Sequence, residues 1–99
     1  MIDLDSIEGF DWDDGNARKS LDRHDVSQAE AEQVFSNEPL LAQDVKHSER
    51  EARFHALGET AEGRRLHVTF TLRDNGTKIR VISARDMNRK ERAIYEQET

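Results

Sequence analysis

The 99-residue chain contains no cysteine, a single proline and no long apolar run. The absence of cysteine excludes disulfide bonds, thiolate metal ligands and cysteine nucleophiles. No apolar stretch approaches the roughly 20 residues of a membrane-spanning helix. The N-terminus also lacks the basic region followed by an apolar run that marks a secretory signal. These absences predict a protein of the cytoplasm with no membrane partner.

Apolar residues are few, but their pattern is sufficient for one small core. They make up 34% of the chain, against 36% for charged residues. Because the apolar residues recur at regular spacings and are not diluted, we expect a folded chain with residues 1–99 in a single domain. The expected core residues are Phe10, Trp12, Val34, Phe35, Phe54, Leu66, Val68, Phe70, Ile79, Val81 and Ile82.

Charge is distributed unevenly along the chain, whose net charge is −6. Residues 1–14 carry six acids and no base, whereas residues 64–92 carry nine bases and three acids. Such asymmetry indicates a surface that binds a polyanion or a charged partner. The alternative is a set of ordinary solvated faces, and charge alone does not separate the two.

The first third of the chain predicts a short strand and two helices. Apolar and acidic residues alternate over 10–13, as in a strand. Asp13 or Asp14 can cap a helix that runs to about Arg23, with Ala17 and Leu21 on its inner face.

Ser27 and Glu30 have the spacing of a capping box for the second helix. This helix would bury Ala31, Val34 and Phe35 and end within residues 37–39.

The rest of the chain predicts strands and one further helix. Residues 40–42 can form a short strand, followed by a polar loop over 46–51. From residue 53 the pattern has period two, and residues 65–73 alternate most clearly. Asn75-Gly76 predicts a hairpin turn into a return strand at 78–85, and Asn88 with Glu91 predicts a helix to about residue 95. We therefore expect an α+β fold: an antiparallel sheet with two N-terminal helices on one face and a short C-terminal helix.

The polar face of the central hairpin is the first candidate site. Side chains two apart on a strand share a face, and cross-strand neighbours lie about 5 Å apart. Arginines on this face suit phosphate oxygens, and histidines can transfer protons near neutral pH. An ordinary solvated sheet face is the alternative. The candidates are Arg53, His55, His67, Thr69, Thr71 and Arg73.

Arg80, Ser83 and Arg85 form a second candidate, at the end of the last strand and before a capped helix. A strand end beside a helix N-terminus can bind an anion. Alternatively, these arginines pair with Glu91 or with the acidic N-terminal segment. The four histidines match no zinc motif, so we expect no metal and no cofactor. Neither Ser83 nor Thr71 has the sequence context of a covalent nucleophile.

Several motifs, in order along residues 9–95, resemble the BrnT-like toxins. The most specific is Arg80-Val81-Ile82-Ser83-Ala84-Arg85. The chain departs from the family pattern at Asn16, where lysine is usual, at Ser20, where asparagine is frequent, and at Asp25, where glycine is usual. The other matching segments are Phe10-Asp11-Trp12-Asp13, Ala17-Arg18, Arg23-His24-Asp25-Val26-Ser27, Glu30-Ala31, Val34-Phe35, Arg50-Glu51-Ala52-Arg53-Phe54, Leu57-Gly58, Gly63-Arg64-Arg65-Leu66, Val68, Glu91-Arg92 and Tyr95.

The resemblance implies a RelE-like fold and the toxin half of a type II toxin–antitoxin pair. It further implies endoribonuclease activity that arrests translation and is relieved by a ribbon-helix-helix, BrnA-like antitoxin. Two toxin chains would assemble around an antitoxin dimer as a heterotetramer, and operator DNA would be bound only through that complex.

Metal-independent RNA cleavage needs a base, an acid and cations for the phosphorane. We expect Arg53, Arg73, Arg80 and Arg85 to contact the phosphate and phosphorane. The base would be Glu51 or His24, with His55 or His67 as alternatives, and Thr71 and Tyr95 would contact substrate. The alternative function is a catalytically weak module that binds the antitoxin and acts mainly in operator autoregulation.

Overall fold

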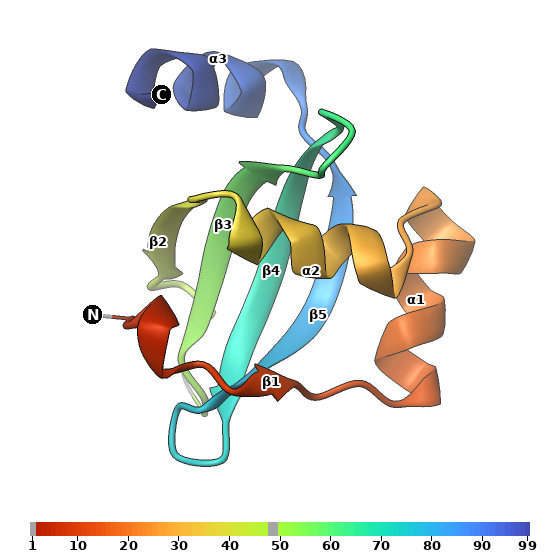
Figure 1. The fold of residues 1–99 in the computed structure, drawn as a ribbon, viewed down its shortest axis with the longest axis vertical. Helices are drawn as coiled ribbons and strands as arrows, with labels where there is room; N and C mark the ends of the chain where they lie inside the picture. The colour runs from red at the N-terminus through yellow and green to blue at the C-terminus, as the bar shows by residue number, and fades with distance from the viewer. Residues whose placement is uncertain (1, 48–49) are drawn as a thin grey trace.

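The computed structural model describes residues 2–47 and 50–99, and these form a five-stranded sheet with three α-helices (Figure 1). The strand order is β1-β5-β4-β3-β2. Two residues of the predicted polar loop, Ser48 and Glu49, lie outside the described residues. In chain order the elements are a 3-10 helix (Leu4–Ser6), β1 (Gly9–Phe10), α1 (Asp14–His24), α2 (Gln28–Ser36), β2 (Leu40–Asp44), β3 (Arg53–Glu59), β4 (Arg65–Arg73), β5 (Lys78–Asp86) and α3 (Arg89–Glu98).

The sheet is mixed, so the prediction of an antiparallel sheet is correct for β2 to β5 and wrong for β1. Strands β2, β3, β4 and β5 pair antiparallel in sequence order, but β1 runs parallel to β5, with Gly9 opposite Lys78 and Phe10 opposite Ile79. Alternating residues predict a strand but carry no information about the direction of its neighbour. The prediction of α+β architecture is confirmed.

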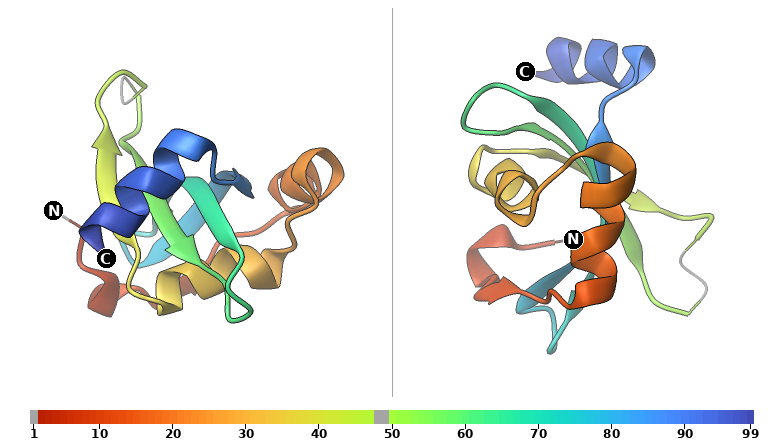
Figure 2. Two further views of the ribbon diagram at one scale, coloured as in Figure 1. Left: turned by 90° about the horizontal axis from the view of Figure 1, so that it is seen from above. Right: turned by 90° about the vertical axis from the view of Figure 1, so that its right-hand side faces the viewer.

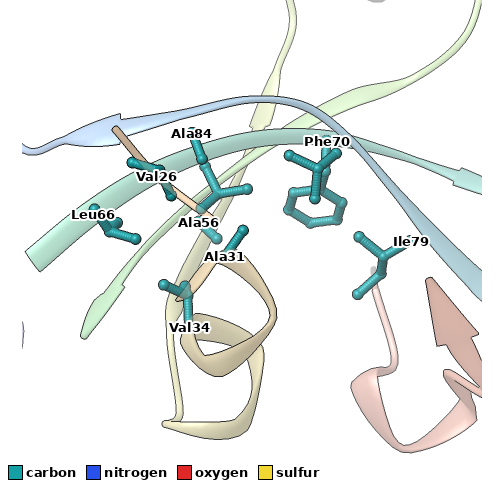
Figure 3. Close-up of a cluster of buried hydrophobic side chains, with 10 residues drawn as sticks. Val26, Ala31, Val34, Ala56, Leu66, Phe70, Ile79 and Ala84 are labelled. Atoms are coloured by element: carbon teal, nitrogen blue, oxygen red, sulfur yellow. The ribbon is translucent and has the colours of Figure 1, made fainter. Parts of the chain in front are cut away.

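The hydrophobic core lies between the sheet and α2, which crosses one face of β3 and β4 (Figures 1 and 2). Phe70 is at its centre, with its ring 4.9 Å from that of Phe35 in an edge-on contact and 5.6 Å from that of Phe54. The predicted cap of α2 is confirmed, since Ser27 and Glu30 form a reciprocal capping box. The fully buried apolar residues, most of them drawn in Figure 3, are Val26, Ala31, Val34, Ala56, Leu66, Val68, Phe70, Ile79, Val81 and Ala84.

Helix α1 lies beside β5 at the edge of the sheet and not flat on its face (Figure 1). Its buried residues are Asn16 and Ser20, whereas Ala17 is half-buried and Leu21 is 49% exposed, so the prediction that Leu21 faces inward was wrong. Strand β1 pairs only with the start of β5. Beyond that point, side chains of α1 form hydrogen bonds with the free backbone edge of β5. The Asn16 side-chain amide donates to the Val81 carbonyl at 2.9 Å, and the Ala84 amide donates to the Ser20 hydroxyl at 2.8 Å. A buried backbone group needs such a partner, which explains two polar residues on a buried helix face.

The irregular apolar spacing of β5 results from a β-bulge. Thr69 pairs with Ser83, but the next residue, Phe70, pairs with Val81, so Ile82 is the extra residue. A bulge shifts the alternation by one residue. Ile79, Val81 and Ala84 therefore all point into the core.

The predicted hairpin between β4 and β5 is also confirmed. Asp74, Asn75 and Gly76 all have positive φ angles, of 53°, 58° and 82°.

Helix α3 stands apart from α1 and α2, over the end of the sheet where β3 ends and β4 begins (Figure 1). Asn88 and Glu91 form its capping box, as predicted, and the helix continues three residues beyond Tyr95. Tyr95 is the buried residue of this helix. No helix in the described ranges is long and apolar enough to cross a bilayer.

Candidate functional site

The face of the sheet opposite α2, here called the outer face, presents three rows of mostly polar side chains. Its members follow from the strand register, which places one residue of each strand side by side. Most of the residues predicted for the site share this face because the two hairpins bring their strands together. From β2 to β5 the rows are Leu40, Leu57, His67 and Arg85; Ala42, His55, Thr69 and Ser83; and Asp44, Arg53, Thr71 and Arg80.

His55 and His67 form a pair at the centre of the outer face, as their positions on adjacent strands predicted. Their ring centroids are 4.7 Å apart. His55 is oriented from both sides: its Nε2 lies 3.1 Å from a carboxylate oxygen of Asp44, and its Nδ1 lies 3.1 Å from the Thr69 hydroxyl. The imidazole of His55 is therefore held in one position beside a carboxylate that can balance a proton on the ring.

His67 is more enclosed, and burial lowers its pKa below the ordinary value of 6.5. The nearby Glu91 acts in the opposite direction, and Arg85 and His55 reinforce the lowering. The Nε2 atom lies 3.8 Å from Glu91, and the Nδ1 atom is buried without a hydrogen-bond partner among the described residues. His67 is thus the histidine suited to be neutral, and able to accept a proton, at neutral pH.

Arg85 completes this cluster through Glu91. Its two terminal nitrogens donate to the two carboxylate oxygens of Glu91 at 2.8 and 2.9 Å. Burial alone would raise the pKa of Glu91, but the hydrogen bonds from Arg85 and from the Asn88 backbone amide lower it overall. The bidentate geometry is the one by which arginine also holds a phosphate.

Two further candidate arginines, Arg80 and Arg73, are also near carboxylates. Arg80 donates to Asp13 at 2.8 Å and lies 3.5 Å from Asp11, while Arg73 lies 3.1 Å from Glu51. The alternative considered for Arg80 and Arg85, pairing with the acidic N-terminal segment and with Glu91, is therefore the arrangement observed. These ion pairs engage the guanidinium groups of the arginines, but the side chains remain at the surface of the outer face.

Three predicted site residues are placed away from the histidine pair or in structural contacts. Thr71 is 2% exposed and donates to the Ala52 carbonyl. Tyr95 is buried, with the Arg65 guanidinium over its ring at 5.6 Å. His24 is exposed at the end of α1, where its carbonyl accepts a hydrogen bond from Arg64. The structure thus brings together His55, His67 and Arg85, but not Tyr95 or His24.

A groove of about 490 Å³ lies between α3 and the outer face. Sequence reasoning missed Asp44 and the contribution of Glu91, which was read only as a helix cap or a possible arginine partner. The period-two pattern of the neighbouring strand gave no register for β2, so Asp44 could not be placed opposite Arg53. The groove is lined by Leu40, Leu41, Ala42, His55, Leu57, His67, Glu91, Ile94 and Glu98.

Within the described ranges, no three side chains of the metal-ligating types lie close enough together to hold a metal ion. In the turn before α2, Asp25 adopts the left-handed region at φ 55°, a conformation that glycine favours and that aspartate tolerates better than most residues. Asn16, where lysine was expected, serves the helix cap and the β5 edge.

Comparison with known proteins identifies first the fold and then the family. The structure is similar to the crystal structure of the Brucella abortus ribonuclease toxin BrnT, with a TM-score of 0.58 and 19% identity over 82% of this chain and 97% of that one. No curated protein matches the sequence. The family described as "Ribonuclease toxin, BrnT, of type II toxin-antitoxin system" matches residues 12–91. The chain belongs to this BrnT toxin family, and membership of a type II system implies an antitoxin partner.

Proposed function

We propose that the chain is a metal-independent endoribonuclease that cleaves RNA on the outer face of its sheet and thereby arrests translation in the cytoplasm. The observation that carries the proposal is the cluster of His55, His67 and Arg85 on one face of a BrnT-family fold. Two imidazoles and a guanidinium supply the base, the acid and the cation that phosphodiester cleavage requires.

In this mechanism a neutral His67 takes the proton of a ribose 2′-hydroxyl, and the resulting oxygen attacks the adjacent phosphorus. Arg85 stabilises the charge of the phosphorane, and His55 gives a proton to the departing 5′-oxygen. The products are a 2′,3′-cyclic phosphate and a free 5′-hydroxyl. The lowered pKa of His67 and the carboxylate beside His55 support this division of roles over a base at His24 or Glu51.

We assign the remaining cations to the rest of the RNA chain. Arg53 and Arg73 lie along the same face on β3 and β4, and Arg80 lies at its β5 edge. Arginines at such spacing suit successive phosphates of a single strand. Thr71 and Tyr95 support the strands and α3 beneath this surface.

The partner we propose is a ribbon-helix-helix antitoxin that covers the outer face and blocks cleavage. Two toxin chains and an antitoxin dimer would form a heterotetramer, and operator DNA would be bound only through the antitoxin. This part of the proposal rests on the family alone.

A second candidate function is a catalytically weak module that holds the antitoxin and tunes operator repression. It is favoured by the carboxylates that pair with Arg73, Arg80 and Arg85, and by a net charge of −6. Both features oppose the approach of a polyanion.

Induced expression in bacteria separates the two functions. We expect wild-type protein to arrest growth and degrade cellular RNA, and the double variant Arg80→Ala plus Arg85→Ala to do neither, because the phosphorane loses Arg85 and the RNA chain loses a phosphate contact at Arg80. RNA integrity on a gel and culture density are the readouts. The control is Arg18→Ala plus Lys19→Ala, which removes two exposed charges from α1. Normal growth and intact RNA with the wild-type protein would favour the binding module.

A further inference from the structure

We propose that the apolar part of the groove under α3 binds a guanine base of the RNA, next to the phosphate held by Arg85. This inference rests on the proposed RNA substrate and assigns the base preference of the same site. It adds a base-binding role to the groove, whose apolar part the mechanism does not use.

The groove changes character along its length. Next to Arg85 it is polar, with His67 and Glu91, whereas toward β2 its floor is formed by Leu40 and Leu57. Across from this floor, Ile94 of α3 is 43% exposed although it is a large apolar residue. An exposed apolar surface enclosed by polar residues is typical of a ligand site.

The shape and lining suit a nucleobase. A volume of about 490 Å³ falls in the range of small-molecule sites, which runs from roughly 300 to 1,000 Å³. A base offers flat apolar faces to Leu57 and Ile94, and the rings of His55 and His67 provide surfaces on which it can stack. A sugar or a phosphate would leave the leucine side chains unpartnered.

Guanine is favoured by the carboxylate of Glu98, which lines the same groove. The oxygens of Glu91 already accept from Arg85, so Glu98 is the acceptor that remains for a ligand. An ionised carboxylate only accepts hydrogen bonds. The Watson–Crick edge of guanine has two adjacent donors, N1–H and N2–H, which can donate to the two oxygens of one carboxylate. On the same edge of adenine, cytosine and uracil each donor is next to an acceptor, so none of these bases can donate two adjacent hydrogen bonds.

Binding of short uncleavable RNA tests the inference. The probes are four fluorescein-labelled 2′-O-methyl pentanucleotides, UUNUU, in which N is each base in turn, and the readout is fluorescence anisotropy. We expect wild-type protein to bind UUGUU about ten-fold more tightly than UUUUU, because one good hydrogen-bonded pair contributes about this much. In Glu98→Gln the preference should fall to about two-fold.

Ile94→Ser should weaken UUGUU binding several-fold by removing the apolar wall, and since Ile94 is already part-exposed the fold should be retained. Glu96→Gln is the matched control: it lies on the same helix but pairs with Arg65 and does not line the groove. It should bind all four probes like the wild type.

Equal affinity for the four probes, or an unchanged guanine preference in Glu98→Gln, would overturn the inference. So would an Ile94→Ser variant that binds RNA normally but no longer binds the antitoxin, since the groove would then be a protein-binding surface. Guanine-selective binding by a protein that fails to cut the matching unmodified RNA would leave the inference intact and contradict the proposed ribonuclease activity.

Discussion

Replacing His55 and His67 together by alanine is expected to reduce RNA cleavage by about 10²–10⁴-fold, the usual contribution of proton transfer by side chains. The two rings are 4.7 Å apart on the outer face, and His67 lies directly opposite Arg85 on the neighbouring strand. The measurement is the initial rate at which purified protein cuts a fluorescent oligoribonucleotide in EDTA.

His47→Ala is the control for this experiment. His47 contacts the same Asp44 as His55, at 3.0 Å, but its side chain is exposed and does not line the groove beneath α3. The control should cleave at the wild-type rate. A double variant that unfolds at the wild-type temperature and still cleaves normally would remove both histidines from the mechanism.

The pH dependence of the wild-type rate reports on His67 separately. Because burial places its pKa below 6.5, the neutral base persists to lower pH than a free histidine would. The free energy of unfolding also decreases at low pH, because the folded state disfavours the charged ring of His67. His67 therefore contributes to stability above pH 6.5, and this contribution is lost as the pH falls through its folded pKa.

Phe70→Ala is expected to lower the free energy of unfolding by about 3–5 kcal/mol, the range for truncating a buried phenylalanine. Phe70 is 0% exposed and contacts both Phe35 and Phe54, so its removal leaves a cavity between α2 and the sheet. Urea denaturation followed by tryptophan fluorescence measures the change.

Leu21→Ala provides the comparison for stability. Sequence periodicity placed Leu21 on the buried face of α1, but the structure leaves it 49% exposed. Its replacement should change the free energy of unfolding by no more than about 0.5 kcal/mol. A loss equal to that of Phe70→Ala would mean that α1 packs through Ala17 and Leu21 after all.

Local patterns predicted most of the fold. Capping residues such as Ser27 and Asn88 fix where helices begin, and strict alternation fixes the faces of β4, because both signals act within a few residues. The parallel pairing of β1 with β5 and the edge position of α1 depend on contacts between distant segments. No local pattern encodes them, and the hydrogen bond from Asn16 to Val81 spans 65 residues.

Local patterns also predicted part of the candidate site, namely the two histidines. His55 and His67 could be placed on adjacent strands because the hairpin between them sets their register to within a row. The position of Asp44 and the position of α3 over the outer face could not be predicted. No local pattern in the loop before β3 or in the segment after β5 determines how β2 and α3 pack against the sheet. The carboxylates that orient His55 and Arg85 come from these two elements.

Cleavage of an oligonucleotide that contains one ribose among deoxyriboses tests the central claim most directly. With purified wild-type protein in EDTA, we predict one cut on the 3′ side of that ribose, giving a 2′,3′-cyclic phosphate by mass spectrometry, and no cut in the all-deoxy strand. No cleavage, cleavage that requires an added divalent metal, or cleavage of the all-deoxy strand would contradict a metal-independent ribonuclease that acts through the 2′-hydroxyl.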